Sequence, residues 1–214
     1  MNLAPSLYKV QAEQNVLSEQ IREEDFSGAA VTSRLDCRIE QAHGDLDGAL
    51  ARYEEIHGIR RALAEELGTP QSRRDLSVSL NNVAGIEQAR GDLDGALEKY
   101  EESLAIAQRF LEHDVTPETQ NGSLWTAHLT ASCVVGLSRL CEALAMLDGV
   151  SSTAAELELA CDDDLNMLDT CAAFYETYAN ASAALGRANE AQRRSERGAA
   201  IRARITALKG GTAR

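Results

Sequence analysis

A segment that occurs twice constrains the fold of this chain more than any other feature of its sequence. Residues 39–50 return forty-seven positions later as residues 86–97, and eleven of the twelve residues are unchanged. The single difference is His43, which becomes Arg90. A self-match at a fixed period is typical of a stacked array, in which each unit buries its apolar side against the next unit. We therefore expect a repeat protein.

The residues around each copy predict pairs of antiparallel helices. The chain is 44% apolar, is rich in Ala, Leu, Glu and Arg, and contains three Pro, a composition that favours helices over strands. Gly44 suits the left-handed end of a helix, and Asp45 or Asp47 can cap the helix that follows. Thr69-Pro70 suits the start of a helix and recurs as Thr116-Pro117, again forty-seven positions later. The period therefore holds at both turns of the unit.

Extending the period over the chain predicts a single array of four helix pairs. A helix over residues 5–24 precedes the pairs, which span residues 27–68, 69–115, 116–161 and 162–209, and residues 210–214 form a loose tail. In the third pair, the segment from Gly149 to Ser152 interrupts the second helix, so we expect a separate short helix over residues 153–161. We expect the acidic triplet at residues 162–164 to cap the helix over residues 165–185 rather than to bind a cation.

Charge argues against several classes of function. The net charge is −13, but residues 187–214 carry +6, so the remainder of the chain is strongly acidic. An acidic body repels nucleic acid and anionic membranes, whereas the basic end could bind an acidic partner or dock on the chain's own body. Because the N-terminus has no leader pattern and no apolar run is long enough to span a bilayer, we expect a cytoplasmic protein.

The sequence offers no constellation of residues for catalysis. The five cysteines include no Cys-x-x-Cys pair, and the four histidines share no metal-ligand spacing. A Ser/His/Asp order and a glycine-rich loop that cradles phosphate are also missing from the sequence. We therefore expect a protein that is not an enzyme and that binds no metal or cofactor.

The second copy of the repeat resembles a tetratricopeptide repeat. Gly91 and Asp92 form its turn, Ala96 and Leu97 follow, and Tyr100 comes three residues after Leu97, as in the pattern of that family. The long period is similar to that of the long-helix variety found in bacterial arrays. The resemblance implies an all-α fold: a right-handed superhelical array of antiparallel helix hairpins (an α-solenoid) with about nine or ten helices. It also implies a protein–protein interaction module, such as an adaptor, a scaffold or a co-chaperone.

In tetratricopeptide arrays the first helix of each pair lines a concave groove that holds a peptide or a partner helix. Counting from the turn glycine, the resemblance assigns the partner-binding positions to Arg34, Arg38, Asn81, Asn82, Trp125, His128, Glu176 and Asn180. Guanidinium and carboxamide groups suit a carboxylate and an extended backbone, so we expect a protein or peptide ligand with an acidic or C-terminal carboxylate end near Arg34 and Arg38. An apolar ligand side chain would lie against Trp125, although the sequence leaves open whether this residue belongs to the groove or to the core.

Two other functions are compatible with the same pattern. The helix over residues 5–24 and the last helix, with Gly198, Ile201, Ile205 and Leu208 on one face, could stack end to end. The chain would then be a homo-oligomeric, self-assembling scaffold. Alternatively, the array could be a regulatory subunit or sensor for an enzyme on another chain.

Overall fold

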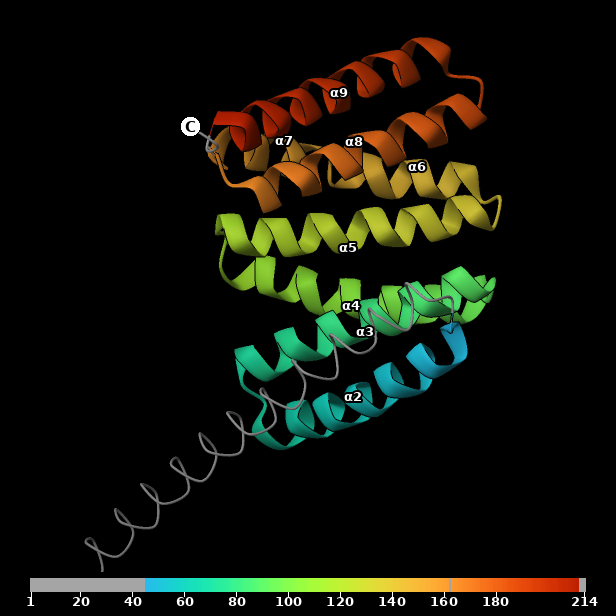
Figure 1. Cartoon of the computed structure of the whole chain (residues 1–214), viewed down its shortest axis with the longest axis vertical. Helices are drawn as coiled ribbons and strands as arrows, with labels where there is room; N and C mark the ends of the chain where they lie inside the picture. The colour runs from blue at the N-terminus through green and yellow to red at the C-terminus, as the bar shows by residue number, and fades with distance from the viewer. Residues whose placement is uncertain (1–44, 162, 212–214) are drawn as a thin grey trace, which may run out of the picture. The chain divides into compact units, whose positions relative to one another are not determined.

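The computed structural model describes residues 45–161 and 163–211, and every element in this part of the chain is an α-helix (Figure 1). The helix expected over residues 5–24, the helix expected to end at His43, and the candidate residues Arg34 and Arg38 lie outside the described residues. The chain divides into two compact units, residues 1–56 and 57–214. The helices are α2 (Leu46–Leu67), α3 (Pro70–Arg90), α4 (Leu93–His113), α5 (Pro117–Gly136), α6 (Leu140–Gly149), α7 (Ser151–Ala160), α8 (Leu165–Ala184) and α9 (Ala188–Gly211).

The repeated Gly-Asp pair forms the turn that the sequence predicts. Gly91 ends α3 in the left-handed region with φ of 88°, and its N–H donates to the carbonyl of Gln88 at 3.0 Å. Asp92 then caps α4, because its Oδ1 accepts from the backbone N–H of Gly95 at 3.0 Å. In the first copy, Asp45 accepts in the same way from Gly48 at 2.9 Å. The first aspartate of each copy is therefore the capping residue.

The cap also explains the second glycine of the repeat. A Cβ atom placed on Gly95 would lie 2.6 Å from Oδ2 of Asp92, and one on Gly48 would lie 2.6 Å from Oδ2 of Asp45. The carboxylate that caps the helix occupies the space that a side chain would need. The identity of the two copies at these positions thus reflects local geometry at the start of a helix.

The threonine caps are also confirmed. Thr69 Oγ1 accepts from the backbone N–H of Ser72 at 3.1 Å at the start of α3. At the start of α5, Thr116 and Thr119 each accept from the other's backbone N–H, at 3.3 and 2.9 Å, which forms a capping box.

The third pair departs from the repeat, as its sequence predicts. Ser138 occupies the position of the turn glycine and adopts φ of 62°, and Arg139 provides no side-chain cap for α6. The second helix of the pair is interrupted at Val150, and α7 begins at Ser151, two residues before the predicted start. Asp164 caps α8 by accepting from two backbone N–H groups at 2.9 and 3.0 Å, in agreement with the predicted role of the acidic triplet.

The helices pack consecutively as hairpins, which confirms the predicted all-α, TPR-like repeat arrangement. Helix α3 packs on α4, α4 on α5, α5 on α6, and α8 on α9, and α5 lies between α4 and α8 (Figure 1). First helices of successive pairs also contact each other, α3 with α5 and α5 with α8. Among the described helices, α4 and α6, the second helices of their pairs, make no such contact. Equivalent positions of α3, α5 and α8 therefore lie next to one another along the array.

The apolar face of α9 is used inside the chain. Ile201 and Ile205 are 4% and 6% exposed and belong to the core cluster that includes Phe174 of α8. A Cβ atom on Gly198 would lie 3.5 Å from the Cβ atom of Tyr175, so α9 approaches α8 closely there. The hypothesis that this face is free for end-to-end stacking is therefore wrong, because its isoleucines pack on α8.

Candidate functional site

We call the surface that α3, α5 and α8 form around two sets of repeat-equivalent positions the first-helix face. In the first set Val78 and Trp125 are exposed and Ala173 is half-buried, and in the second set Asn82, Leu129 and Thr177 are all half-buried. A hydrogen bond crosses from α3 to α5, in which Asn81 Nδ2 donates to Thr126 Oγ1 at 3.2 Å.

Two large apolar side chains are exposed on the first-helix face. Val78 is 37% exposed and Trp125 is 38% exposed, and they occupy equivalent positions of adjacent repeats. Trp125 thus lies at the surface rather than in the core, where the sequence left its place open. The ring of His128 packs edge-on against Trp125, with ring centroids 4.7 Å apart and an interplanar angle of 70°.

Buried polar atoms without a hydrogen-bond partner concentrate beside these apolar groups. Within the described part of the chain, four of the six buried side-chain atoms without a hydrogen-bond partner are Asn81 Oδ1, Asn121 Oδ1 and both ring nitrogens of His128, and the other two are Glu87 Oε2 and Ser182 Oγ. His128 is only 8% exposed. Such atoms cost about 1–3 kcal/mol each when they stay unsatisfied, so proteins rarely place several together without a reason.

The imidazole of His128 is held in its neutral form. Burial lowers its pKa from the ordinary value to about 4, and the nearby carboxylates of Asp169 and Glu176 oppose this shift only in part. A neutral imidazole offers one N–H donor and one acceptor nitrogen.

Helix α8 contributes carboxylates to the first-helix face. Glu176 accepts from Arg202 Nε of α9 at 2.8 Å, and Arg202 also forms an ion pair with Asp169. One guanidinium therefore serves two carboxylates. Asn180 is exposed one turn further along α8, and Asn82 is half-buried on α3.

The structure brings together residues that the sequence did not combine. Asn121 lies one turn before Trp125 on α5, and this spacing alone would have placed it on the same stripe as the predicted residues. The predicted Arg34 and Arg38 are outside the described residues. The described part of the face therefore exposes an indole ring and carboxylates, with half-buried amides and the buried neutral imidazole of His128 beside them.

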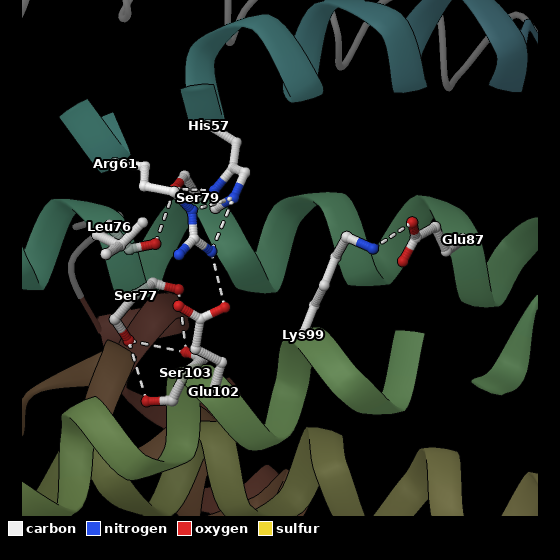
Figure 2. Close-up of polar contacts among 9 residues, drawn as sticks. All are labelled: His57, Arg61, Leu76, Ser77, Ser79, Glu87, Lys99, Glu102 and Ser103. Atoms are coloured by element: carbon white, nitrogen blue, oxygen red, sulfur yellow. Dashed lines mark hydrogen bonds and ion pairs between the residues drawn. The ribbon is translucent and has the colours of Figure 1, made fainter. Parts of the chain in front are cut away.

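A second polar cluster joins α2, α3 and α4 and contains a serine–histidine pair (Figure 2). His57 Nε2 accepts from Arg61 Nε at 3.3 Å, which leaves the proton on Nδ1 to donate to Ser79 Oγ at 3.1 Å. Ser79 in turn donates to the carbonyl of Leu76 at 2.7 Å. Figure 2 shows Arg61 reaching from His57 to Glu102, whose carboxylate accepts at 2.7 Å.

This cluster lacks the arrangement of a catalytic triad. The carboxylate of Glu102 contacts Arg61 rather than the imidazole, and the hydroxyl of Ser79 donates to the backbone instead of to the base. Ser79 is also only 1% exposed, so a substrate has no access to it. The cluster ties three helices together, as does the neighbouring hydrogen bond between the hydroxyls of Ser77 and Ser103 at 2.8 Å.

Residues 45–161 and 163–211 bear on two further classes of site, metal sites and membrane spans. In these ranges, no three or more His, Cys, Asp or Glu side chains are grouped so that they could hold a metal ion. None of the helices in the same ranges has the length and apolar character needed to cross a membrane.

Comparison with known proteins finds helical repeat structures. No protein-family model and no curated protein matches the chain. Two of the similar structures are of kinesin light chain from Podosopora anserina with nearly identical TPR-like repeats. The first is 19% identical, covers 82% of this chain and 95% of its own, and has a TM-score of 0.48. The second is 18% identical, covers 86% of this chain and 96% of its own, and has a TM-score of 0.44. A de novo designed helical repeat protein is 20% identical, with 90% of this chain and 98% of that chain covered and a TM-score of 0.45. At these TM-scores the likeness says nothing about function.

Proposed function

We propose that the chain is a non-catalytic protein–protein interaction module whose first-helix face holds a segment of another polypeptide. The observation that carries the proposal is the concentration of unpaired buried atoms on that face: Asn81 Oδ1, Asn121 Oδ1 and both ring nitrogens of His128. If the side chains turn so that these atoms face a bound ligand, hydrogen bonds to the ligand remove the cost and add to affinity. Val78 and Trp125 provide exposed apolar surface for its side chains.

The unpaired atoms specify the hydrogen-bonding groups of the ligand. Amide oxygens of Asn81 and Asn121 accept hydrogen bonds, and the neutral imidazole of His128 both donates and accepts. An extended polypeptide offers N–H and C=O groups in alternation, with apolar side chains between them. A ligand carboxylate near Arg34 and Arg38 stays a prediction, because both arginines lie outside the described residues.

Gly122 supports a close approach of the ligand backbone to α5. A glycine inside a helix costs about 0.5–1 kcal/mol relative to alanine, and glycine is common where a backbone must approach a ligand. A Cβ atom on Gly122 would meet nothing within 4 Å, so packing within the described chain does not require the glycine. Gly58 on α2 is equally open, but its helix carries none of the unpaired atoms.

Peptide selection on the full chain tests this proposal. The probe is a displayed library of random twelve-residue peptides, and selected peptides are synthesised with a fluorescent label for anisotropy titrations. Trp125 is the only tryptophan, so its emission should change on binding. We expect Asn81→Ala and Asn121→Ala to weaken binding several-fold each, because each removes a hydrogen bond that contributes about 0.5–1.5 kcal/mol. Trp125→Ala should weaken it tenfold or more, since a buried aromatic anchor contributes about 2 kcal/mol or more.

Gly122→Leu and Gly58→Leu form a matched pair for the same titrations. Both introduce the same side chain at an exposed glycine inside a helix where a Cβ atom would meet nothing within 4 Å, so we expect both variants to fold. We expect Gly122→Leu to block binding and Gly58→Leu to leave it unchanged. Equal affinity of the selected peptides for the unmodified chain and for all first-helix-face variants would show that the ligand site lies elsewhere.

The remaining sequence predictions stand beside this proposal. A cytoplasmic location and a regulatory role toward an enzyme on another chain stay predictions. The apolar face of α9 packs against α8 and is therefore not available for end-to-end assembly. A peptide-binding first-helix face would serve an adaptor, a scaffold or a regulatory subunit equally well.

A further inference from the structure

The five arginines of α9 divide into two groups. Three of its arginines dock on the chain's own body: Arg197 pairs with Glu158 at 2.8 Å, Arg202 with Asp169 and Glu176, and Arg204 with Asp163 at 3.2 Å. Arg193 and Arg194 form no ion pair with a carboxylate among the described residues. Over residues 45–161 and 163–211, the charges of Arg193 and Arg194 are therefore not neutralised by a carboxylate.

These two arginines line a cavity at the surface of α9. The cavity has a volume of about 290 Å³, and its lining residues are Glu190, Arg193, Arg194 and Arg197. Positions 190, 193, 194 and 197 lie on one side of a helix, since they are spaced by three or four residues. Three arginines and one glutamate thus line the same opening.

Aromatic rings hold two of the guanidinium groups in place. The Cζ atom of Arg194 lies 4.2 Å from the ring centroid of Tyr178, and that of Arg197 lies 5.2 Å from the ring centroid of Tyr175. Both tyrosines are buried in the core, so the rings are fixed. A guanidinium that rests on a ring face keeps the N–H donors at its edge available for oxygen atoms. Arg194 is therefore oriented before any ligand arrives.

The charges around the cavity indicate what charge a ligand there would carry. Glu190 pairs with Arg187 at 3.6 Å, and Glu158 pairs with Arg197. The hydroxyl of Tyr178 donates to the carboxylate of Asp148 and also lies 3.4 Å from Oε1 of Glu190. The charges on Arg193 and Arg194 remain, and together they match a phosphate monoester, which carries about −1.5 to −2 at neutral pH.

We propose that Arg193, Arg194 and Arg197 form a binding site for a phosphate monoester on α9, separate from the first-helix face. Edge N–H groups of Arg194 and Arg193 donate to the phosphate oxygens, in the forked geometry that guanidinium groups favour. Arg197 adds a third donor while it retains its ion pair with Glu158. The cavity is larger than a phosphate group, so part of the group that carries the phosphate enters it as well.

Calorimetric titration of the full chain tests this site with three probes. The probes are inorganic phosphate, a phosphoserine heptapeptide with its unphosphorylated form as control, and adenosine 5′-monophosphate. We expect saturable binding that weakens at least tenfold in the double variant Arg193→Gln/Arg194→Gln and that falls with added salt. Arg194→Lys should also weaken binding, because lysine keeps the charge but loses the fork and the contact with the ring.

A control variant separates a specific site from general charge. Arg73→Gln/Arg109→Gln removes two exposed arginines from α3 and α4, so it changes the net charge by the same amount. This variant should bind the probes as the unmodified chain does. Circular dichroism and thermal unfolding check that both double variants are folded.

The three probes distinguish the source of the phosphate. Tighter binding of the phosphopeptide supports a site for modified proteins, tighter binding of the nucleotide supports a site for a small metabolite, and equal binding supports a site for phosphate itself. Two results would overturn the proposal: no saturable binding of any phosphate probe, or the same loss of binding in both double variants. Neither result bears on peptide binding by the first-helix face, which is measured with different variants.

Discussion

Replacement of Gly95 by alanine tests whether the aspartate cap dictates the glycine that follows it in the repeat. The added Cβ atom would lie 2.6 Å from Asp92 Oδ2 and 3.0 Å from its Cγ, so the carboxylate has to move. Moving it breaks the hydrogen bond from the Gly95 N–H to Asp92 Oδ1. The reference substitution is Gly122→Ala, since its Cβ atom would meet nothing.

The magnitudes follow from the two sites. Gly122→Ala should raise the free energy of unfolding by about 0.5–1 kcal/mol, the difference in helix propensity between the residues. The free energy of unfolding of Gly95→Ala should be about 1 kcal/mol lower than that of Gly122→Ala, because a lost N-cap costs about 0.5–2 kcal/mol. For a chain of this length, 1 kcal/mol corresponds to about 2–4 °C in the melting temperature.

Urea unfolding followed by circular dichroism measures the difference, provided that the slope with denaturant stays the same for all variants. A double-mutant cycle isolates the cap. In the Asp92→Ala background the clash is absent, so Gly95→Ala should stabilise about as much as Gly122→Ala does. The reasoning is refuted if Gly95→Ala and Gly122→Ala stabilise the chain equally when Asp92 is present.

Three further perturbations have defined outcomes. Ser138→Gly should raise the free energy of unfolding by about 1 kcal/mol, because Ser138 adopts φ of 62°, and a lower melting temperature would contradict this. Lys99→Met should lower the free energy of unfolding by about 3 kcal/mol, because it removes the ion-pair partner that lies 2.6 Å from the buried carboxylate of Glu87 (Figure 2). The double variant Lys99→Met/Glu87→Leu should recover most of this loss, as measured by urea unfolding. The pKa of His128 is about 4 in the folded state and 6.5 in the unfolded state, so the unfolded state binds more protons between these values and stability falls as the pH falls. The free energy of unfolding should fall by about 2 kcal/mol from pH 6.5 to 5. His128→Leu should lose less over the same range, and an equal loss in both proteins would mean that the imidazole is accessible to water.

The sequence predicted the turns and caps because they depend on residues only a few positions apart. A glycine such as Gly91 can adopt the left-handed conformation with its neighbours alone, and Asp92 reaches a backbone N–H three residues ahead. The interruption near Val150 was predictable for the same reason, since the helix pattern fails within the segment itself.

The candidate site was predictable only in part. The repeat period assigned Asn81 and Trp125 to the first helices, but it could not say that Asn81 would reach Thr126, forty-five residues away. Nor could it say that His128 would be buried without a partner. Both facts depend on how closely α3, α5 and α8 approach one another.

The sequence by itself therefore determined an all-α repeat of helix pairs with defined starts and ends, because helix periodicity and capping are local. Only the tertiary structure decided which polar groups lost their water, since burial depends on helices far apart in the sequence. It also decided which side of α9 faces the rest of the chain, because Ile201 and Ile205 pack on α8 and fix the rotation of α9 about its own axis. That rotation turns Arg202 toward Glu176 and leaves Arg193 and Arg194 without a carboxylate among the described residues.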